Sequence, residues 1–192
     1  MTYNENMSME TTRRKSLEVM HKGMISYKLA YLGWDVSDHY GDGYDLIAVK
    51  KQENMCSLVK IELKAVDLST YSKKARGFSQ AVSVNEIVAA THIIVSLFDG
   101  ISPKGHFIMT MKQAFEAKRK TRKYSKFKNF QEYRRASAQV ARTNVSNRKG
   151  SKEETIRLSL DIGSTFNRYE QGKWDCWSFK DKWENLHITE HN

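Results

Sequence analysis

Apolar residues in the first part of the chain recur at helical spacing. Spacings of three and four residues predict a helix over 13–32 with one apolar stripe. The stripe comprises Leu17, Met20, Met24, Tyr27 and Tyr31. Gly33 follows at once and is typical of a residue that ends a helix. Residues 1–12 lack this pattern, and we expect them to form a flexible N-terminus.

Runs of apolar residues further along the chain predict β-strands. They are expected at 34–37, 44–49, 57–66, 91–98, 105–111 and 155–161. The first three would form a meander, and the unbroken apolar run over 91–98 is typical of a buried central strand. Helical patterns cover 78–90, the stretch from 112 onward, and 130–142. This order predicts an α/β fold, in which helices flank a mixed β-sheet.

The composition is that of a globular chain with one core. Of the 192 residues, 40% are apolar and 28% are charged. We expect a core over 13–117 and an extension over 118–192 whose C-terminal aromatic residues pack on that core. Two cysteines are too few for a disulfide scaffold, and no apolar run approaches the roughly 20 residues of a membrane span. We therefore expect an intracellular, cytoplasmic protein.

The positive charge of the chain is concentrated in one segment. Residues 118–150 hold twelve Lys or Arg against a single acid, Glu132, whereas the net charge of the whole chain is only +10. A basic segment beside a nearly neutral domain is expected of nucleic-acid contact, although a solvated helix surface remains an alternative. The candidate binding residues are Lys118, Arg119, Lys120, Arg122, Lys123, Lys126, Lys128, Arg134 and Arg135.

Charged residues occur in the two long predicted strands of the N-terminal half. Asp45 lies at the start of one strand after a glycine-rich turn, and Glu62 and Lys64 share one face of the next. Two carboxylates on neighbouring strands could hold Mg²⁺ together with the backbone carbonyl of Leu63, and Lys64 would stand beside the ion. A pair of solvent-facing charges is the alternative. The apolar surroundings of Glu62 favour a functional role, since charge is costly in a central strand.

The stretches GYD and IELK resemble the core of the PD-(D/E)XK nuclease superfamily, which includes restriction endonucleases and Holliday-junction resolvases. The element order over about residues 13–115 is most similar to the small resolvase-like members. The resemblance implies a restriction-endonuclease-like core and hydrolysis of DNA phosphodiester bonds. It also implies that Asp45 and Glu62 bind Mg²⁺, with Mn²⁺ as a substitute, and that Lys64 is the catalytic lysine.

The chain departs from the superfamily pattern at two points. Tyr44 stands where the signature has proline. Many members also carry a glutamate on the first helix, where this chain offers Ser26 and Tyr27. Glu18 is the nearest acid, but at about 100° per residue it falls on the opposite side of the helix from Tyr27. A second metal ion is therefore not implied.

Gln80, at the start of the helix expected over 78–90, matches a position where some members place a polar residue near the site. The function predicted is a metal-dependent DNA endonuclease. A homodimer is expected because cutting both strands of a duplex requires two sites. A non-catalytic nucleic-acid-binding protein with the same fold and an RNA-directed nuclease are the alternatives.

Overall fold

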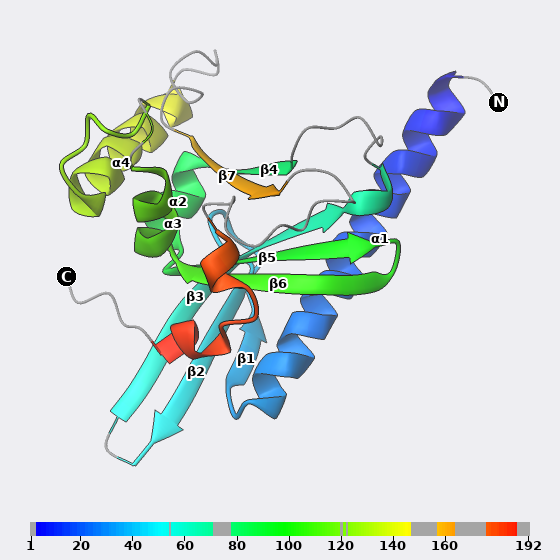
Figure 1. The fold of residues 1–192 in the computed structure, drawn as a ribbon, viewed down its shortest axis with the longest axis horizontal. Helices are drawn as coiled ribbons and strands as arrows, with labels where there is room; N and C mark the ends of the chain where they lie inside the picture. Colours follow the sequence, from blue (N-terminus) through cyan, green and yellow to red (C-terminus); the bar gives the residue numbers. More distant parts are fainter. Residues whose placement is uncertain are drawn as a thin grey trace.

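A five-stranded mixed sheet forms the centre of the computed structural model (Figure 1). The structure describes residues 3–53, 55–70, 78–119, 121, 123–146, 157–163 and 176–187. The strand order is β1-β2-β3-β5-β6, and β3 runs parallel to β5 while the other neighbours are antiparallel. These strands are β1 Asp35–Asp38, β2 Leu46–Gln52, β3 Met55–Asp67, β5 His92–Asp99 and β6 Ser102–Thr110. The predicted meander and mixed sheet are confirmed.

Helices cover both faces of this sheet. They are α1 Tyr3–Tyr31, α2 Val84–Ala89, α3 Met111–Lys118 and α4 Phe130–Ser146, with short 3₁₀ turns η1 Leu68–Thr70, η2 Trp177–Phe179 and η3 Trp183–His187. One core cluster joins β3, β5 and β6 to α2, α3 and α4, and the other joins the sheet to α1 and η3. In Figure 1, α2, α3 and α4 gather on the left, while α1 passes the sheet and extends beyond it. No described helix is long and apolar enough to cross a membrane.

The first helix differs from its prediction in its start and in its buried face. It begins at Tyr3 rather than near Arg13, so the segment expected to be flexible is helical from its third residue. The buried side chains are His21, Ile25 and Leu29, whereas Tyr27 and Tyr31 are each 76% exposed. The predicted apolar stripe was therefore wrong at Tyr27 and Tyr31, while Leu17, Met20 and Met24 are half-buried. The face that is fully buried includes His21, a polar residue that the apolar pattern left out.

The helix predicted over 78–90 was wrong in its first half. Phe78–Val82 forms β4, which pairs antiparallel with β7, Leu158–Gly163, in a separate two-stranded sheet. Helix α2 begins only after Ser83, whose side chain accepts a hydrogen bond from the backbone of Glu86 in a capping box. A partner strand from the far end of the chain decides the conformation of β4, and local spacing does not contain that information.

The C-terminal segment packs along β6, the edge strand of the five-stranded sheet. Lys180 pairs with Phe107 in an isolated bridge, and the side-chain amide of Asn185 donates to the carbonyl of Ile108 at 2.7 Å. Phe179 and Trp183 are partly buried against the two core clusters. Trp174 lies outside the described residues. The segment thus covers backbone groups that an exposed sheet edge would leave unpaired.

A buried chain of polar side chains fixes α1 to the sheet. The hydroxyl of Ser96 lies 2.7 Å from Nε2 of His21 and 2.7 Å from Nδ1 of His106. Burial, reinforced by the nearby His106, lowers the pKa of His21 to about 3. Burial also lowers the pKa of His106, although Asp181 opposes the shift. Both rings are therefore neutral in the folded protein at neutral pH.

We expect acid to destabilise the fold through His21. The unfolded chain takes up this proton near pH 6.5, whereas the folded chain does so only near 3, so stability falls as the pH drops between these values. The contribution is about 1.4 kcal/mol per pH unit. Urea unfolding from pH 7.5 to 5 would measure the slope in the wild type and in His21→Gln, which keeps a polar group but cannot titrate. Equal slopes would contradict the neutral buried ring.

Candidate active site

Asp45 is held against the strand that carries Glu62 and Lys64. It lies just before β2, its backbone amide donates to the carbonyl of Ile61 at 2.8 Å, and its Oδ2 accepts the amide of Leu63 at 2.8 Å. The carboxylate of Asp45 is therefore fixed beside the backbone between Glu62 and Lys64. The structure brings the three predicted catalytic residues together, Asp45 from just before β2 and the other two from β3.

The glycine turn before Asp45 packs tightly on α2. Gly43 has a φ of +104°, and a Cβ at this position would lie 2.6 Å from Cβ of Ala89 and 3.0 Å from the carbonyl oxygen of Asn85. The ring of His39 stacks on Tyr44 with a centroid distance of 4.0 Å. The backbone conformation and the close approach both require glycine. Helix α2 therefore sets the position from which the chain enters β2 at Asp45.

A second contact from α2 holds the predicted catalytic lysine. Nζ of Lys64 lies 2.7 Å from Oε1 of Glu62 and 2.9 Å from Oε1 of Glu86. The other carboxylate oxygen of Glu86 accepts the backbone amide of Ser83 at 2.8 Å. One glutamate thus caps α2 and positions Lys64. Glu86 was not predicted as a site residue, although the spacing of Ser83 and Glu86 is that of a capping box and could have placed it at a helix start.

Burial and neighbouring charges shift the pKa of both Glu62 and Lys64. Burial raises the pKa of Glu62 to about 7, and the carboxylates of Glu86 and Asp45 add to the rise while Lys64 opposes it. Burial alone would lower the pKa of Lys64, but the carboxylates of Glu62 and Glu86 outweigh it and raise that pKa. Lys64 is therefore held as an ammonium group, which suits the stabilisation of negative charge.

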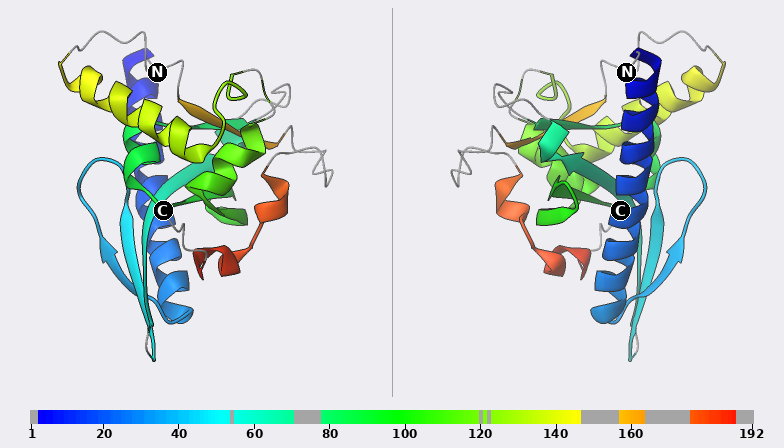
Figure 2. Two further views of the ribbon diagram at one scale, coloured as in Figure 1. Left: turned by 90° about the vertical axis from the view of Figure 1, so that its left-hand side faces the viewer. Right: turned by 90° about the vertical axis from the view of Figure 1, so that its right-hand side faces the viewer.

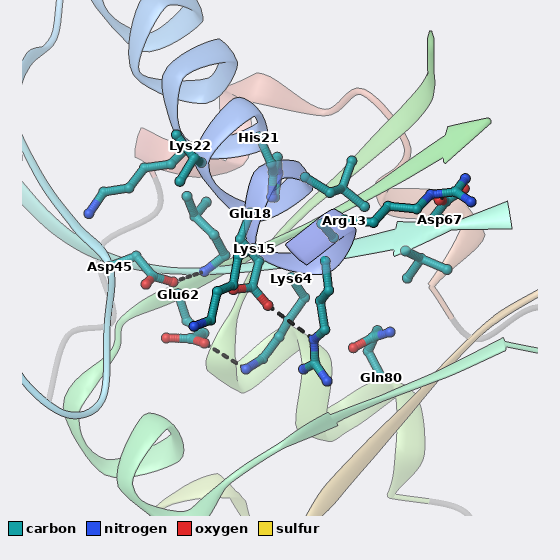
Figure 3. A pocket seen from close by; sticks show the side chains of 16 residues that line it. Arg13, Lys15, Glu18, His21, Lys22, Asp45, Glu62, Lys64, Asp67 and Gln80 are labelled. Carbon is teal, nitrogen blue, oxygen red and sulfur yellow. Dashed lines mark hydrogen bonds and ion pairs between the residues drawn. The ribbon is translucent and has the colours of Figure 1, made fainter. Parts of the chain in front are cut away.

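A cleft of about 770 Å³ lies between these residues and α1 (Figure 3). Four cations of α1 line it, namely Arg13, Arg14, Lys15 and Lys22. Arg13 is paired with Asp67 at 2.7 Å, and Arg14 with Glu18 at 3.2 Å. Gln80 also lines the cleft, from strand β4 rather than from the start of a helix. The cleft therefore carries acids on the sheet and mainly cations on the helix.

Glu18 also lines the cleft, contrary to the expectation that the first helix offers no acid there. Glu18 and Tyr27 were predicted to lie on opposite sides of the helix, but it is the Tyr27 side that faces solvent. Figure 3 shows Glu18 and Lys15 pointing from α1 into the cleft, on the side of Glu62 and Lys64. The helix face could not be chosen from sequence because it depends on the burial of His21.

The residues of the predicted basic segment have different environments. Lys118 is buried, Arg119 is paired with Glu116 at 3.4 Å, and the side chain of Lys123 donates to the carbonyl of Arg157 at 2.8 Å. Arg134 donates to the carbonyl of Val88. The exposed members are Lys126, Lys128 and Arg135, with Arg119 and Lys123 exposed beside their partners. Lys120 and Arg122 lie outside the described residues.

The donor set of the cleft is compatible with magnesium. Asp45 and Glu62 supply carboxylate oxygens, which are the hard ligands that Mg²⁺ prefers, and Mg²⁺ commonly binds through one or two carboxylates with water and phosphate oxygens completing its shell. Among the described residues, no group of three or more His, Cys, Asp or Glu is close enough to hold a metal ion by itself. The residues present therefore fit an ion that is shared with water and substrate.

No family model matches the sequence, and no curated protein matches it. Among solved structures, the chain is similar to a bacterial homing endonuclease, I-Ssp6803I. The likeness covers 89% of this chain and 90% of that chain, at 12% sequence identity and a TM-score of 0.45. The interpretation of the cleft therefore depends on the contacts of its own side chains.

The tight turn at Gly43 gives a testable prediction. In Gly43→Ala the new methyl would overlap Ala89, so we expect a loss of about 1–2 kcal/mol from the backbone conformation and about 1–3 kcal/mol more from the overlap. Gly100→Ala is the matched control, because Gly100 also has a positive φ, +62°, but nothing lies within 4 Å of an added Cβ. Chemical denaturation would compare them. Equal losses would show that contact with α2 does not restrict Gly43.

Proposed function

We propose that the protein is a metal-dependent endonuclease that hydrolyses DNA phosphodiester bonds, of the restriction or resolvase-like type. The observation that carries the proposal is the cluster of buried Glu62 with half-buried Asp45 and Lys64 at the floor of a cleft whose opposite wall is mainly cationic. Buried charge in a central strand is costly, and a role in phosphoryl chemistry accounts for its presence. Two acidic residues beside an ammonium group suit a reaction on an anionic substrate.

In this proposal Asp45 and Glu62 hold Mg²⁺, or Mn²⁺ in its place, and the carbonyl of Leu63 is a further candidate ligand. The bound ion would supply positive charge for activating a water molecule and for stabilising the leaving oxygen. Lys64, kept as an ammonium group between two carboxylates, offsets negative charge that develops on the phosphate. Gln80 lines the same cleft and is a candidate for hydrogen bonding to the substrate.

Cations outside the cleft would bind the phosphates that flank the cut. The exposed lysines of the basic segment, Lys126 and Lys128, are candidates. Lys15 of α1, which lines the cleft, is a candidate for phosphate contact within it. A homodimer would bring two such sites to the two strands of a duplex. The free cysteines, one exposed and one buried, are compatible with the reducing interior of a cell, where the substrate would be found.

We expect purified protein to cut DNA in the presence of Mg²⁺ and Lys64→Ala to cut it about 100- to 1,000-fold more slowly, as for loss of a charge-stabilising donor. Supercoiled, linear and branched DNA and RNA would be tested side by side. Lys51→Ala removes an exposed lysine of the β2–β3 hairpin and should cut normally. Binding without cleavage of any substrate would instead support a non-catalytic binding protein, and cleavage of RNA alone would support an RNA-directed nuclease.

Glu86 should contribute to cleavage through Lys64. Glu86→Gln keeps an oxygen that can accept the amide of Ser83 but removes the charge beside Lys64, so we expect little change in thermal stability and about tenfold slower cleavage. Single-turnover rates at saturating protein and Mg²⁺ would measure the effect. The control Glu116→Gln makes the same chemical change on the exposed part of α3 and should leave the rate unaltered. A wild-type rate in Glu86→Gln would contradict the positioning role.

A further inference from the structure

The outer face of α4 carries four long polar side chains that the fold does not use. Gln131, Arg135, Gln139 and Arg142 are all exposed, and we call them the α4 stripe. At about 100° per residue they fall within about 80° of one another around the helix axis. The opposite side buries Phe130, Tyr133 and Ser137. In the left view of Figure 2, no other helix or strand lies in front of α4.

Other polar residues of this helix have structural partners. The guanidinium of Arg134 donates to the carbonyl of Val88 at 2.6 Å and lies over the ring of Phe130. Glu132 accepts the backbone amide of Lys128 at 2.7 Å. In the part of the chain that the structure describes, no hydrogen bond or ion pair involves a side chain of the α4 stripe. These side chains are available to a partner.

The chemistry of the stripe distinguishes base recognition from simple attraction to phosphates. Arginine suits either role, because it binds phosphates and also pairs with two acceptors of guanine in the major groove. Glutamine carries no charge and gains little from phosphates, but its amide pairs with adenine through two hydrogen bonds. Two glutamines interleaved with two arginines therefore favour contact with base edges. Lys126 and Lys128, exposed just before the helix, would contact the phosphate backbone of the DNA.

The dimensions of α4 also suit duplex DNA. The stripe spans twelve residues, about 16 Å of helix from first to last, which matches roughly five base pairs. The major groove of B-form DNA admits an α-helix, whereas that of A-form RNA is too narrow. Arg134 and Val88 join α4 to α2, and α2 supplies Glu86 to Lys64. DNA held by α4 would thus be linked, through the contact between Arg134 and Val88, to the helix that positions the proposed catalytic lysine.

We propose that α4 enters the major groove of duplex DNA and that the α4 stripe reads base sequence, which gives the enzyme a preferred target. This proposal rests on the proposed function in taking DNA as the substrate. It assigns a specificity role to Gln131, Gln139 and Arg142, as well as to Arg135. The phosphate-binding role remains with the lysines that precede the helix.

The test is selection of binding sites from a random duplex pool by the full chain without Mg²⁺, followed by fluorescence anisotropy on the selected and a scrambled duplex. We expect the wild type to select a motif. Gln139→Ala and Arg135→Ala should each weaken binding to the selected duplex about 10- to 100-fold and change the affinity for the scrambled duplex little. Each should also relax the base preference at one or two positions of the motif. Arg135→Lys keeps the charge but loses the paired hydrogen bonds, so it should behave like Arg135→Ala on the selected duplex.

Lys126→Ala is the control for non-specific attraction. It should weaken binding to both duplexes equally and reduce the steepness of log affinity against log salt by about one. Any of three results would overturn the inference. They are a wild type without base preference, an equal loss of affinity for both duplexes in Gln139→Ala, and a preference for duplex RNA. Cleavage is measured separately: a protein that selects a motif but cuts nothing supports the inference and refutes the nuclease, and non-selective cutting does the reverse.

Discussion

The arrangement of the candidate site depends on a partly buried ion cluster in which Lys64 lies between the carboxylates of Glu62 and Glu86. Strand β3 is paired on both sides, so a lone charge on it would be strongly destabilising. The two contacts of 2.7 and 2.9 Å offset much of this cost, and the amide of Leu63 similarly satisfies Asp45. Replacing such a cluster with apolar residues is often neutral or stabilising, so stability does not account for its presence, whereas the proposed function does.

Helix α2 is short, but it contacts Lys64, the turn that precedes Asp45, and helix α4. Its backbone at Asn85 and side chain at Ala89 leave room only for glycine at position 43, which sets the approach to Asp45. Glu86 holds Lys64, and the carbonyl of Val88 holds Arg134 of α4. A shift of this helix would therefore move the acid, the lysine and the basic segment together. The six residues of α2 couple catalysis to substrate binding in the proposed enzyme.

Much of the sheet could be predicted from sequence because its strands are set by local patterns. The alternation around Glu62 and Lys64 and the apolar run of β5 are properties of consecutive residues. The predictions were wrong where contacts between residues distant in sequence determine the local structure. Strand β4 exists through its pairing with β7, and the buried face of α1 is chosen by the contact between His21 and Ser96. The same error removed Glu18 from the predicted site, since its position follows from the rotation of α1.

The net charge of the chain overstates the number of cations available to a nucleic acid. Arg13 is paired with Asp67, Lys64 with two glutamates and Arg134 with a backbone carbonyl, so each is part of the fold. Lys118 is buried. Fewer cations remain exposed than the sequence contains, and they lie in two places. Some lie along the cleft wall and some at the start of α4. Because attraction to phosphates carries no sequence information, a preference among DNA sequences must come from side chains that the fold leaves uncommitted, and α4 presents four of them on one face.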